Sequence, residues 1–270
     1  MQPVEVWAAG DAYEPYIGRW SRLVARELLR WLALPGGSVW LDVGCGTGAL
    51  AGAVLAAADP AALVGLDPSP GFVAHARARL GDPRARFVVA DARRLPLADA
   101  AVDAAVSGLV LNFVPDPAQA VAEMARVTRP GGRVAAYVWD YAEGMELIRR
   151  FWDAAADLDP AATDLDEGRR FPLCRPEPLA GLLRDAGLAG VEARPLRVPT
   201  VFRDFDDYWA PFLGGQGPAP GYVMSLDAPR RAALRAALAA RLPAAADGSI
   251  ALTARAWAVA GRTPGPVSGR

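Results

Sequence analysis

The chain contains no lysine, one histidine and two cysteines, although its 270 residues include 29 basic and 30 acidic side chains. The absence of lysine excludes catalysis through a lysine Schiff base or a lysine general base. Cys45 and Cys174 lie near no histidine cluster, so they make neither a zinc site nor a disulfide framework, and no metal is expected. The formal net charge of −1 gives no electrostatic footprint for DNA or RNA.

Long hydrophobic runs are also missing. The alanine-rich stretch 232–246 is interrupted by Arg235, Arg241 and Pro243, so no segment is expected to span a bilayer. The first residues show no basic segment followed by an apolar one, so no signal peptide is predicted. We therefore expect a cytoplasmic protein with no membrane partner. Apolar residues make up 53% of the chain, which is typical of a globular protein with a sizeable core.

The most informative stretch is an apolar run, residues 39–43, that leads into Gly44, Gly46 and Gly48 and then into an alanine-rich segment. This order predicts a buried parallel strand, a tight turn and a helix. Glycine permits positive φ and close approach of a ligand, and the free N–H groups at a helix start favour negative charge. The loop therefore indicates a nucleotide-like cofactor. On its own it also fits an ordinary strand-to-helix turn or, with Ala49, the dinucleotide pattern of NAD enzymes.

Strands and helices are predicted to alternate along the chain. The expected strands are 39–43, 62–66, 86–90, 102–106, 133–139, 191–198 and 250–260, and residues 129–132 are expected to form a turn. The expected helices are 21–32, 49–58, 71–80, 117–128, 143–158 and 179–186, with two more helical stretches in 204–247. This alternation is typical of an α/β, doubly wound parallel sheet with right-handed crossovers.

Two insertions interrupt the later part of this pattern, and inserted segments in compact domains are often lids or binding segments. We therefore predict a helical cap over the ligand crevice. The predicted organisation is a helical segment at 1–37 that closes over the cofactor, a cofactor-binding core at 38–140, a C-terminal part of the sheet at 141–262 with cap insertions at 141–178 and 204–247, and a flexible tail at 263–270.

Three acidic residues lie at predicted strand ends, namely Asp42, Asp67 and Asp91. Ligands of such sheets bind at the carboxyl edge, where these side chains are expected to meet. A carboxylate after the second strand can accept hydrogen bonds from ribose hydroxyls, and a polar group after the third can meet an adenine. A carboxylate beside the glycine loop repels pyrophosphate and suits an ammonium or sulfonium, which favours S-adenosylmethionine (SAM) over NAD.

Five segments in this order resemble the motifs of class I SAM-dependent methyltransferases, over roughly half of the chain. They are 41–48 (LDVGCGTG), 65–69 (GLDPS), 89–92 (VADA), 103–116 and 126–132 (RVTRPGG). The closest subgroup resembles the small-molecule methyltransferases of the ubiquinone/menaquinone type. The resemblance implies a Rossmann-like sheet of seven strands in the order 3-2-1-4-5-7-6, with strand 7 antiparallel. It also implies SAM as the cofactor and S-adenosylhomocysteine (SAH) as its product.

The same resemblance assigns roles to individual positions. The glycines of the loop would let the backbone approach the methionine part of SAM, and Asp42 would hold the loop or the ammonium. Asp67 would bind the ribose. The remaining implied cofactor residues are Pro68, Ser69 and Phe72 near the ribose and adenine, Asp91 and Ala92 at the adenine edge, Ser107, Gly108 and Leu109 along the methionine part, and Tyr16 and Arg19 in the N-terminal segment, where Arg19 could pair with the SAM carboxylate.

The sequence says less about the transferred methyl group. SAM is already activated, so positioning can supply much of the acceleration, and a general base is needed only if the acceptor must lose a proton. Asp140 and Tyr141, just after the fifth strand, are the weak catalytic candidates. An aromatic pocket for a small-molecule acceptor could include Trp139, Tyr141, Trp152, Phe171, Trp209 and Phe212, although these side chains could equally form the core of the cap.

Three functions stay open at this point. The first is SAM-dependent methylation of an O, N or C atom of a small molecule. The second is an NAD-type oxidoreductase built on the same glycine turn. The third is a protein of the SAM fold that binds its ligand without transferring a methyl group. The oligomeric state is not readable from the sequence.

Overall fold

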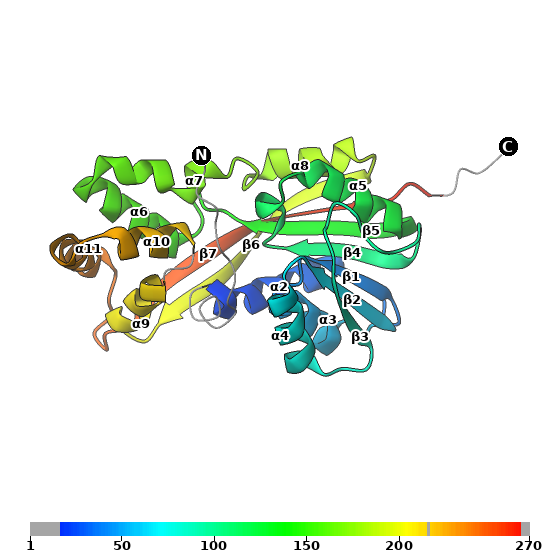
Figure 1. Cartoon of the computed structure of the whole chain (residues 1–270), viewed down its shortest axis with the longest axis horizontal. Helices are drawn as coiled ribbons and strands as arrows, with labels where there is room; N and C mark the ends of the chain where they lie inside the picture. Colours follow the sequence, from blue (N-terminus) through cyan, green and yellow to red (C-terminus); the bar gives the residue numbers. More distant parts are fainter. Residues whose placement is uncertain (1–16, 215–216, 266–270) are drawn as a thin grey trace. The chain divides into compact units, whose positions relative to one another are not determined.

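The computed structural model describes residues 17–214 and 217–265, and in this part of the chain seven strands form one sheet in the order β3-β2-β1-β4-β5-β7-β6 (Figure 1). The strands are β1 (Val39–Val43), β2 (Ala62–Asp67), β3 (Ala85–Val89), β4 (Val102–Gly108), β5 (Thr128–Trp139), β6 (Ala189–Phe202) and β7 (Ile250–Arg262). β3, β2, β1, β4 and β5 pair in parallel. The predicted strand order is confirmed.

Strand β7 runs antiparallel to β5, as predicted. Near the start of β5, the N–H of Gly131 donates to the carbonyl of Thr263, and just past its end the N–H of Asp140 donates to the carbonyl of Arg255. The numbering of the partners therefore falls along β7 as it rises along β5, which is the antiparallel arrangement.

The start of β5 differs from the prediction. Val102 pairs with Thr128 but Ala104 pairs with Arg133, so residues 129–132 bulge out of an already formed strand instead of preceding it. Gly131 has φ 77°, a conformation that glycine adopts without strain. Thr263 exchanges backbone hydrogen bonds with Gly131 and Gly132 and is 7% exposed. Thr263, the first residue of the predicted tail, is therefore held by the sheet, and residues 266–270 lie outside the described part.

Several helices begin at capping residues. Ser69, Asp116 and Asp227 accept hydrogen bonds from the first turns of α4, α5 and α11. The helices are α2 (Arg19–Leu32), α3 (Ala49–Ala57), α4 (Pro70–Leu80), α5 (Pro117–Val127), α6 (Glu146–Leu158), α7 (Glu167–Arg170), α8 (Pro176–Asp185), α9 (Phe205–Trp209), α10 (Pro218–Ser225) and α11 (Ala228–Arg241), with 3-10 turns η2 (Leu111–Phe113), η3 (Pro160–Leu165) and η4 (Ala210–Gly214). Within the described residues, none of these helices has the length and apolar character that a bilayer crossing requires.

The chain divides into two compact units. The sheet unit comprises residues 21–138, 173–196 and 257–270, and the helical unit comprises 1–20, 139–172 and 197–256, so the division passes through β5, β6 and β7. In the sheet unit, α3 connects β1 to β2, which lies on the β3 side of β1 in the sheet. Helix α5 connects β4 to β5, which lies on the β6 side of β4, so the two connections run toward opposite edges of the sheet (Figure 1). Right-handed crossovers therefore place these two helices on opposite faces of the sheet.

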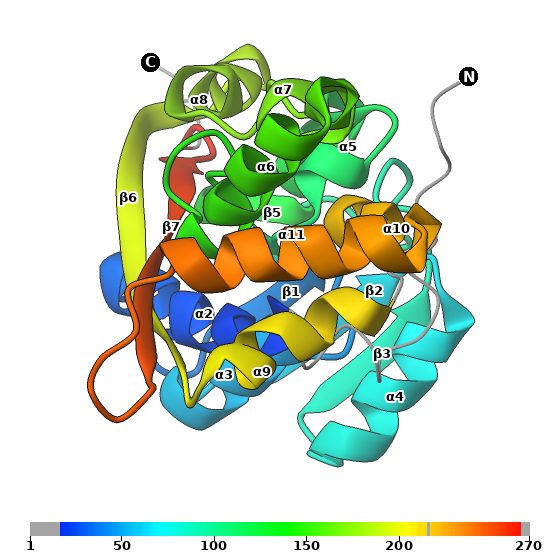
Figure 2. The same ribbon diagram turned by 90° about the vertical axis from the view of Figure 1, so that its left-hand side faces the viewer.

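The helical unit has a core of its own. Its central helix α6 buries Leu147, Ile148, Phe151 and Trp152 along one face. Helices α10 and α11 lie alongside α6 (Figure 2). Aromatic rings fill much of this core, since Phe151 stacks on Phe212 with centroids 4.6 Å apart.

Candidate functional site

The glycine loop that follows β1 is shaped by three positive φ angles. Gly44, Gly46 and Gly48 have φ values of 75°, 51° and 85°. A Cβ on Gly44 would come within 2.5 Å of the Val110 side chain, whereas a Cβ on Gly46 would meet nothing within 4 Å. Gly48 forms the N-cap of α3. The loop therefore packs tightly against the segment after β4 at its first glycine and exposes its backbone to open space at the second.

Asp67, at the end of β2, is built into this loop. Its Oδ2 accepts the N–H of Gly46 at 3.0 Å and its Oδ1 accepts the N–H of Ser69 at 2.9 Å. Burial raises the pKa of Asp67, and the two N–H donors oppose that rise. Each carboxylate oxygen can accept a further hydrogen bond, so Asp67 can still hold the two hydroxyls of a ribose.

Asp42 is a buried carboxylate beside the same loop. It is 1% exposed, and neither of its oxygens has a hydrogen-bond partner among the described residues. Burial raises the pKa of Asp42 from 3.8 to about 7, and the charge of Asp67 adds to this rise. The backbone N–H of Ala51 lies near enough to oppose the rise but forms no hydrogen bond of normal geometry with the carboxylate. An unpaired buried carboxylate is costly, so this position suits a ligand that carries a positive charge. The loop, Asp42 and Asp67 therefore fit the ribose and ammonium of SAM.

The thiol between these two acids has no chemistry of its own. Cys45 is 5% exposed. Burial raises the pKa of the thiol, and the neighbouring charges of Asp42 and Asp67 raise it further. A thiol that keeps its proton is a poor nucleophile, so Cys45 fills space in the loop.

Asp91, which follows β3 as expected, has its carboxylate engaged elsewhere. Arg93 donates Nε and Nη2 to it, at 3.0 Å to Oδ1 and 2.6 Å to Oδ2, and also donates its backbone N–H. These contacts lower the pKa of Asp91 to about 2. Ala92 is buried and can offer only its backbone. The role of both residues at an adenine stays a prediction.

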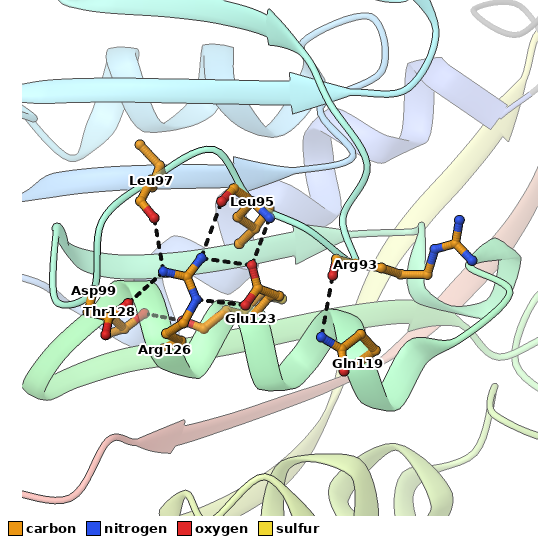
Figure 3. Close-up of polar contacts among 9 residues, drawn as sticks. Arg93, Leu95, Leu97, Asp99, Gln119, Glu123, Arg126 and Thr128 are labelled. Carbon is orange, nitrogen blue, oxygen red and sulfur yellow. Dashed lines mark hydrogen bonds and ion pairs between the residues drawn. The ribbon is translucent and has the colours of Figure 1, made fainter.

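The loop after β3 is fastened to α5 by a polar network that the sequence did not reveal (Figure 3). Glu123 accepts the backbone N–H of Leu95 at 2.8 Å and two donors of Arg126 at 2.6 and 2.7 Å. Arg126 also donates to the carbonyls of Leu95 and Leu97 and to the carboxylate of Asp99. Its guanidinium lowers the pKa of Glu123. Helix α5 therefore fixes the loop that carries Asp91 and Ala92.

The segment after β4 contributes to the site through the path of its backbone more than through polar side chains. The hydroxyl of Ser107 is buried and donates to the carbonyl of Val43 at 2.9 Å, so it links β4 to β1. A Cβ on Gly108 would come within 2.5 Å of the Tyr137 hydroxyl. Leu109 has φ 64°, a strained conformation for a residue with a side chain, and it turns the chain so that Val110 meets Gly44.

Asn112, in η2, has a buried Nδ2 with no hydrogen-bond partner among the described residues. An unpaired buried donor is a group that a ligand can satisfy. The sequence places Asn112 after β4 but assigns it no role.

The catalytic candidates lie at the end of β5, in the helical unit. Asp140 accepts Nε of Arg255 at 2.6 Å on Oδ2 and the N–H of Glu143 at 3.1 Å on Oδ1, and it is 2% exposed. This carboxylate fixes the end of β5 to β7, which leaves it poorly placed to take a proton. Tyr141 is buried and lies against Phe171, with ring centroids 5.9 Å apart. A catalytic role for either residue stays a prediction.

The residues predicted for an acceptor pocket all belong to the helical unit, but most are buried. Trp139, Trp152 and Phe212 are 1%, 2% and 0% exposed, and Trp209 is 6% exposed. The indole N–H of Trp152 donates to Glu167, and Phe212 packs between Phe151 and Trp209. Such burial favours a packing role for these rings. Their binding of an acceptor is untested.

Arg19 belongs to the helical unit and is paired within it. Its Nη1 donates to Oδ1 of Asp207 at 3.0 Å, and its guanidinium lies 4.4 Å from the ring centroid of Trp20 and 4.7 Å from that of Phe202. Nε and Nη2 are buried and have no partner among the described residues, so the guanidinium can still receive an anion. The predicted pairing with the SAM carboxylate stays a prediction. Tyr16 lies outside the described residues.

The described residues contain no group of three or more histidine, cysteine or acidic side chains that could hold a metal ion. Asp42, the open face of Gly46 and the remaining acceptor capacity of Asp67 all lie in the sheet unit, where two neighbouring parallel strands end.

Comparison with known proteins gives a consistent result. Residues 41–136 match the family model described as a methyltransferase domain. A malonyl-[acyl-carrier protein] O-methyltransferase of Hahella chejuensis is 38% identical over 135 residues, which are 46% of this chain and 48% of that protein. The chain spans less than half of the length of the first curated relatives that it matches.

Two solved structures extend the comparison to the fold. A phosphoethanolamine N-methyltransferase 2 of Haemonchus contortus, in complex with phosphomonomethylethanolamine and SAH, has a TM-score of 0.59 and 17% identity, over 94% of this chain and 56% of that one. The [4+2]-cyclase SpnF has a TM-score of 0.53 and 24% identity, over 92% of this chain and 82% of that one. At these identities the likeness concerns the fold alone.

Proposed function

Because residues 41–136 match a methyltransferase-domain family model and the sheet has the strand order of class I SAM-dependent methyltransferases, we propose that this protein transfers the methyl group of SAM to a small-molecule acceptor. The observation that carries the proposal is the hydrogen bond from Gly46 of the glycine loop to Asp67, with the unpaired carboxylate of Asp42 beside it. SAM supplies a methyl carbon already activated by the sulfonium. The chain supplies the binding and orientation.

Each residue of the site has a separate task in this proposal. Asp67 accepts hydrogen bonds from the ribose hydroxyls while it keeps Gly46 and Ser69 in place. Asp42 attracts the ammonium of the methionine part, since its oxygens have no other partner in the described part of the chain. The open face of Gly46 lets the ligand approach the backbone. This charge distribution opposes the pyrophosphate of NAD, so an oxidoreductase on the same turn is disfavoured.

The acceptor is the finer part of the proposal. The relative from Hahella chejuensis acts, by its name, on a malonyl group held by an acyl-carrier protein. A carboxylate oxygen is therefore one acceptor to test, both in free acids and on a carrier protein. O-, N- and C-methylation remain the classes to separate, and membership of the ubiquinone/menaquinone-type subgroup stays a prediction.

The first experiment is calorimetric titration of the full chain with SAM and with SAH. Binding of both is expected, and the absence of binding by folded protein would refute the cofactor assignment. NADH fluorescence on mixing tests the oxidoreductase in the same samples. A screen for released SAH should then use carboxylic acids, phenols, amines and malonyl-carrier protein as acceptors.

The second candidate is a protein of this fold that binds a ligand without methylating it, because the fold, which a [4+2]-cyclase shares, does not by itself imply methyl transfer. The two candidates differ in turnover. Tight SAM binding with release of SAH for one acceptor class supports the transferase. Tight binding with no SAH released for any acceptor supports the second candidate.

A further inference from the structure

A pocket lies in the sheet unit between α2, α3 and the end of α4. Its charged side chains are all basic, whereas those of the proposed cofactor site are acidic. The pocket has a volume of about 620 Å³, within the range of roughly 300–1,000 Å³ that is usual for small-molecule sites. Neither the sequence motifs nor the proposed function assigns it a role. All of its lining residues are described, and none of them is acidic.

The rim of the pocket is strongly basic. Arg22, Arg26 and Arg30 recur every fourth residue on one face of α2, and Arg79 faces them from α4. Like charges at this spacing destabilise a helix, so such a row calls for a compensating interaction. Arg30 forms an ion pair with Glu27, and Arg79 donates a hydrogen bond to the carbonyl of Thr47. Among the described residues, Arg26 has no such partner.

The floor of the pocket is apolar and exists because α3 presents small residues. Ala49, Gly52, Ala53, Ala56 and Ala57 recur at helical spacing along the face of α3 that lines it. These side chains are too small to fill the space below the arginines. The floor is completed by the apolar side chains of Leu29, Leu34, Trp40 and Leu80.

Trp40 adds a single polar group to this apolar floor. The residue is 1% exposed, and its indole N–H has no hydrogen-bond partner among the described residues. Indole N–H and guanidinium groups can only donate hydrogen bonds. The polar part of a matching ligand must therefore accept them, and its remainder must be apolar.

We propose that this pocket binds an amphipathic anion, a molecule with a carboxylate or phosphate head and an apolar tail. The head pairs with the guanidinium groups of the rim, which match carboxylate and phosphate oxygens in two-point contacts. The tail lies on the alanine face of α3. The pocket serves a ligand other than SAM, since the chemistry of the two sites is opposite in sign.

The test uses the full chain and two probes, decanoate and decyl phosphate, below their micelle-forming concentrations. Calorimetry at low ionic strength is expected to show saturable binding that weakens as salt is raised. Decyltrimethylammonium, with the same tail and the opposite charge, is the control probe. Comparable binding of that cation would mean adsorption of the tail alone and would overturn the proposal, as would no binding of either anion at millimolar concentration.

Two variants locate the site. Arg26→Gln should weaken decanoate binding about tenfold, whereas Arg86→Gln, the same change at an exposed arginine of β3 outside the pocket, should leave it unchanged. Ala57→Phe should reduce binding at least as much by filling the pocket, and Ala78→Phe, at an exposed position of α4, should not.

These measurements need no methyl transfer, so they stand apart from the proposed function. Equal binding by Arg26→Gln and Arg86→Gln, or by Ala57→Phe and Ala78→Phe, would overturn the proposal. Sedimentation velocity supplies the remaining outcome. A dimer of the parent chain that Arg26→Gln dissociates would assign this face to contact between copies and would also overturn it.

Discussion

The two units of this protein bury opposite kinds of side chain at the positions where function was expected. In the sheet unit, the predicted site contains carboxylates that are buried and incompletely paired, Asp42 above all. In the helical unit, the predicted site contains aromatic rings that pack against one another, such as Phe212 on Phe151. Buried unpaired charge costs free energy and indicates a ligand, whereas packed rings stabilise the fold without one.

The largest expected effect tests the packing side of this comparison. Phe212→Ala removes a side chain with no exposed surface, so we expect the free energy of unfolding to fall by about 3–5 kcal/mol. Phe205→Ala, at a half-buried ring on α9, is the control and should cost about 1 kcal/mol or less. Denaturant unfolding followed by tryptophan fluorescence measures both.

The same pair of variants can break the comparison. If Phe212 lines an acceptor pocket instead, Phe212→Ala will leave stability close to that of Phe205→Ala and will raise the KM for the acceptor. SAM affinity should be the same in both variants at temperatures where they are folded, because Asp42, Gly46 and Asp67 lie in the sheet unit.

The second prediction concerns the carboxylates of Asp67, at the end of β2, and Asp91, just after β3. Asp67→Ala should weaken SAM binding about 100-fold, because it removes the ribose acceptor and frees the N–H groups of Gly46 and Ser69. Asp91→Ala should weaken it by less than about threefold, because Arg93 already occupies that carboxylate. Calorimetry with SAH reports both. Equal losses would show that Asp91 leaves Arg93 to bind the adenine.

The architecture was predictable from the sequence because its signals are local. The alternation of apolar runs and helical patterns predicted the strand count, and the glycines with Asp67 placed the cofactor loop. The strand order came from the resemblance to class I SAM-dependent methyltransferases. The start of β5 was not predictable, since the bulge at 129–132 is held by Thr263 from the far end of the chain. The local sequence Pro-Gly-Gly is compatible with both a turn and a bulge, so it does not distinguish them.

Some details of the site were not predictable either, because they depend on contacts between residues that are far apart in the sequence. Arg255 binds Asp140 from 115 residues away, and no local pattern announces such a pair. The contact of Val110 with Gly44 depends on a left-handed Leu109, a conformation for which a leucine gives no warning. By contrast, Asp42, Gly46 and Asp67 came together as predicted, because neighbouring parallel strands end at the same edge.

A third prediction uses the raised pKa of Asp42. With a pKa of about 7 in the free protein, the carboxyl must lose its proton before it can attract the ammonium of SAM. SAM affinity should therefore rise about tenfold between pH 5.5 and 7 and flatten above that. Asp42→Asn should bind SAM more weakly at pH 7 and show little of this dependence. An equally steep rise in Asp42→Asn would place the titrating group elsewhere.

The stability of the ligand-free protein should change in the opposite sense. Between the unfolded pKa of 3.8 and the folded value of about 7, the folded state binds more protons at Asp42 than the unfolded state does. The contribution of Asp42 to stability is therefore lost progressively as pH rises through this window. Relative to the parent chain, Asp42→Asn should gain stability from pH 4 to pH 7. Thermal unfolding at several pH values measures the difference.

The smallest expected effect concerns the network between α5 and the loop after β3. Glu123→Gln keeps the shape of the side chain but removes the charge that binds Arg126, and it weakens the acceptor of the Leu95 N–H. We expect a loss of about 1–2 kcal/mol of stability, faster hydrogen exchange at Leu95, and roughly threefold weaker SAM binding. Gln119→Ala, which removes one long exposed contact to the carbonyl of Arg93, is the control and should change neither affinity nor exchange at Leu95. Faster exchange with unchanged SAM affinity would show that this loop can move without disturbing the cofactor, and the adenine would then depend on the glycine loop and Asp67 alone.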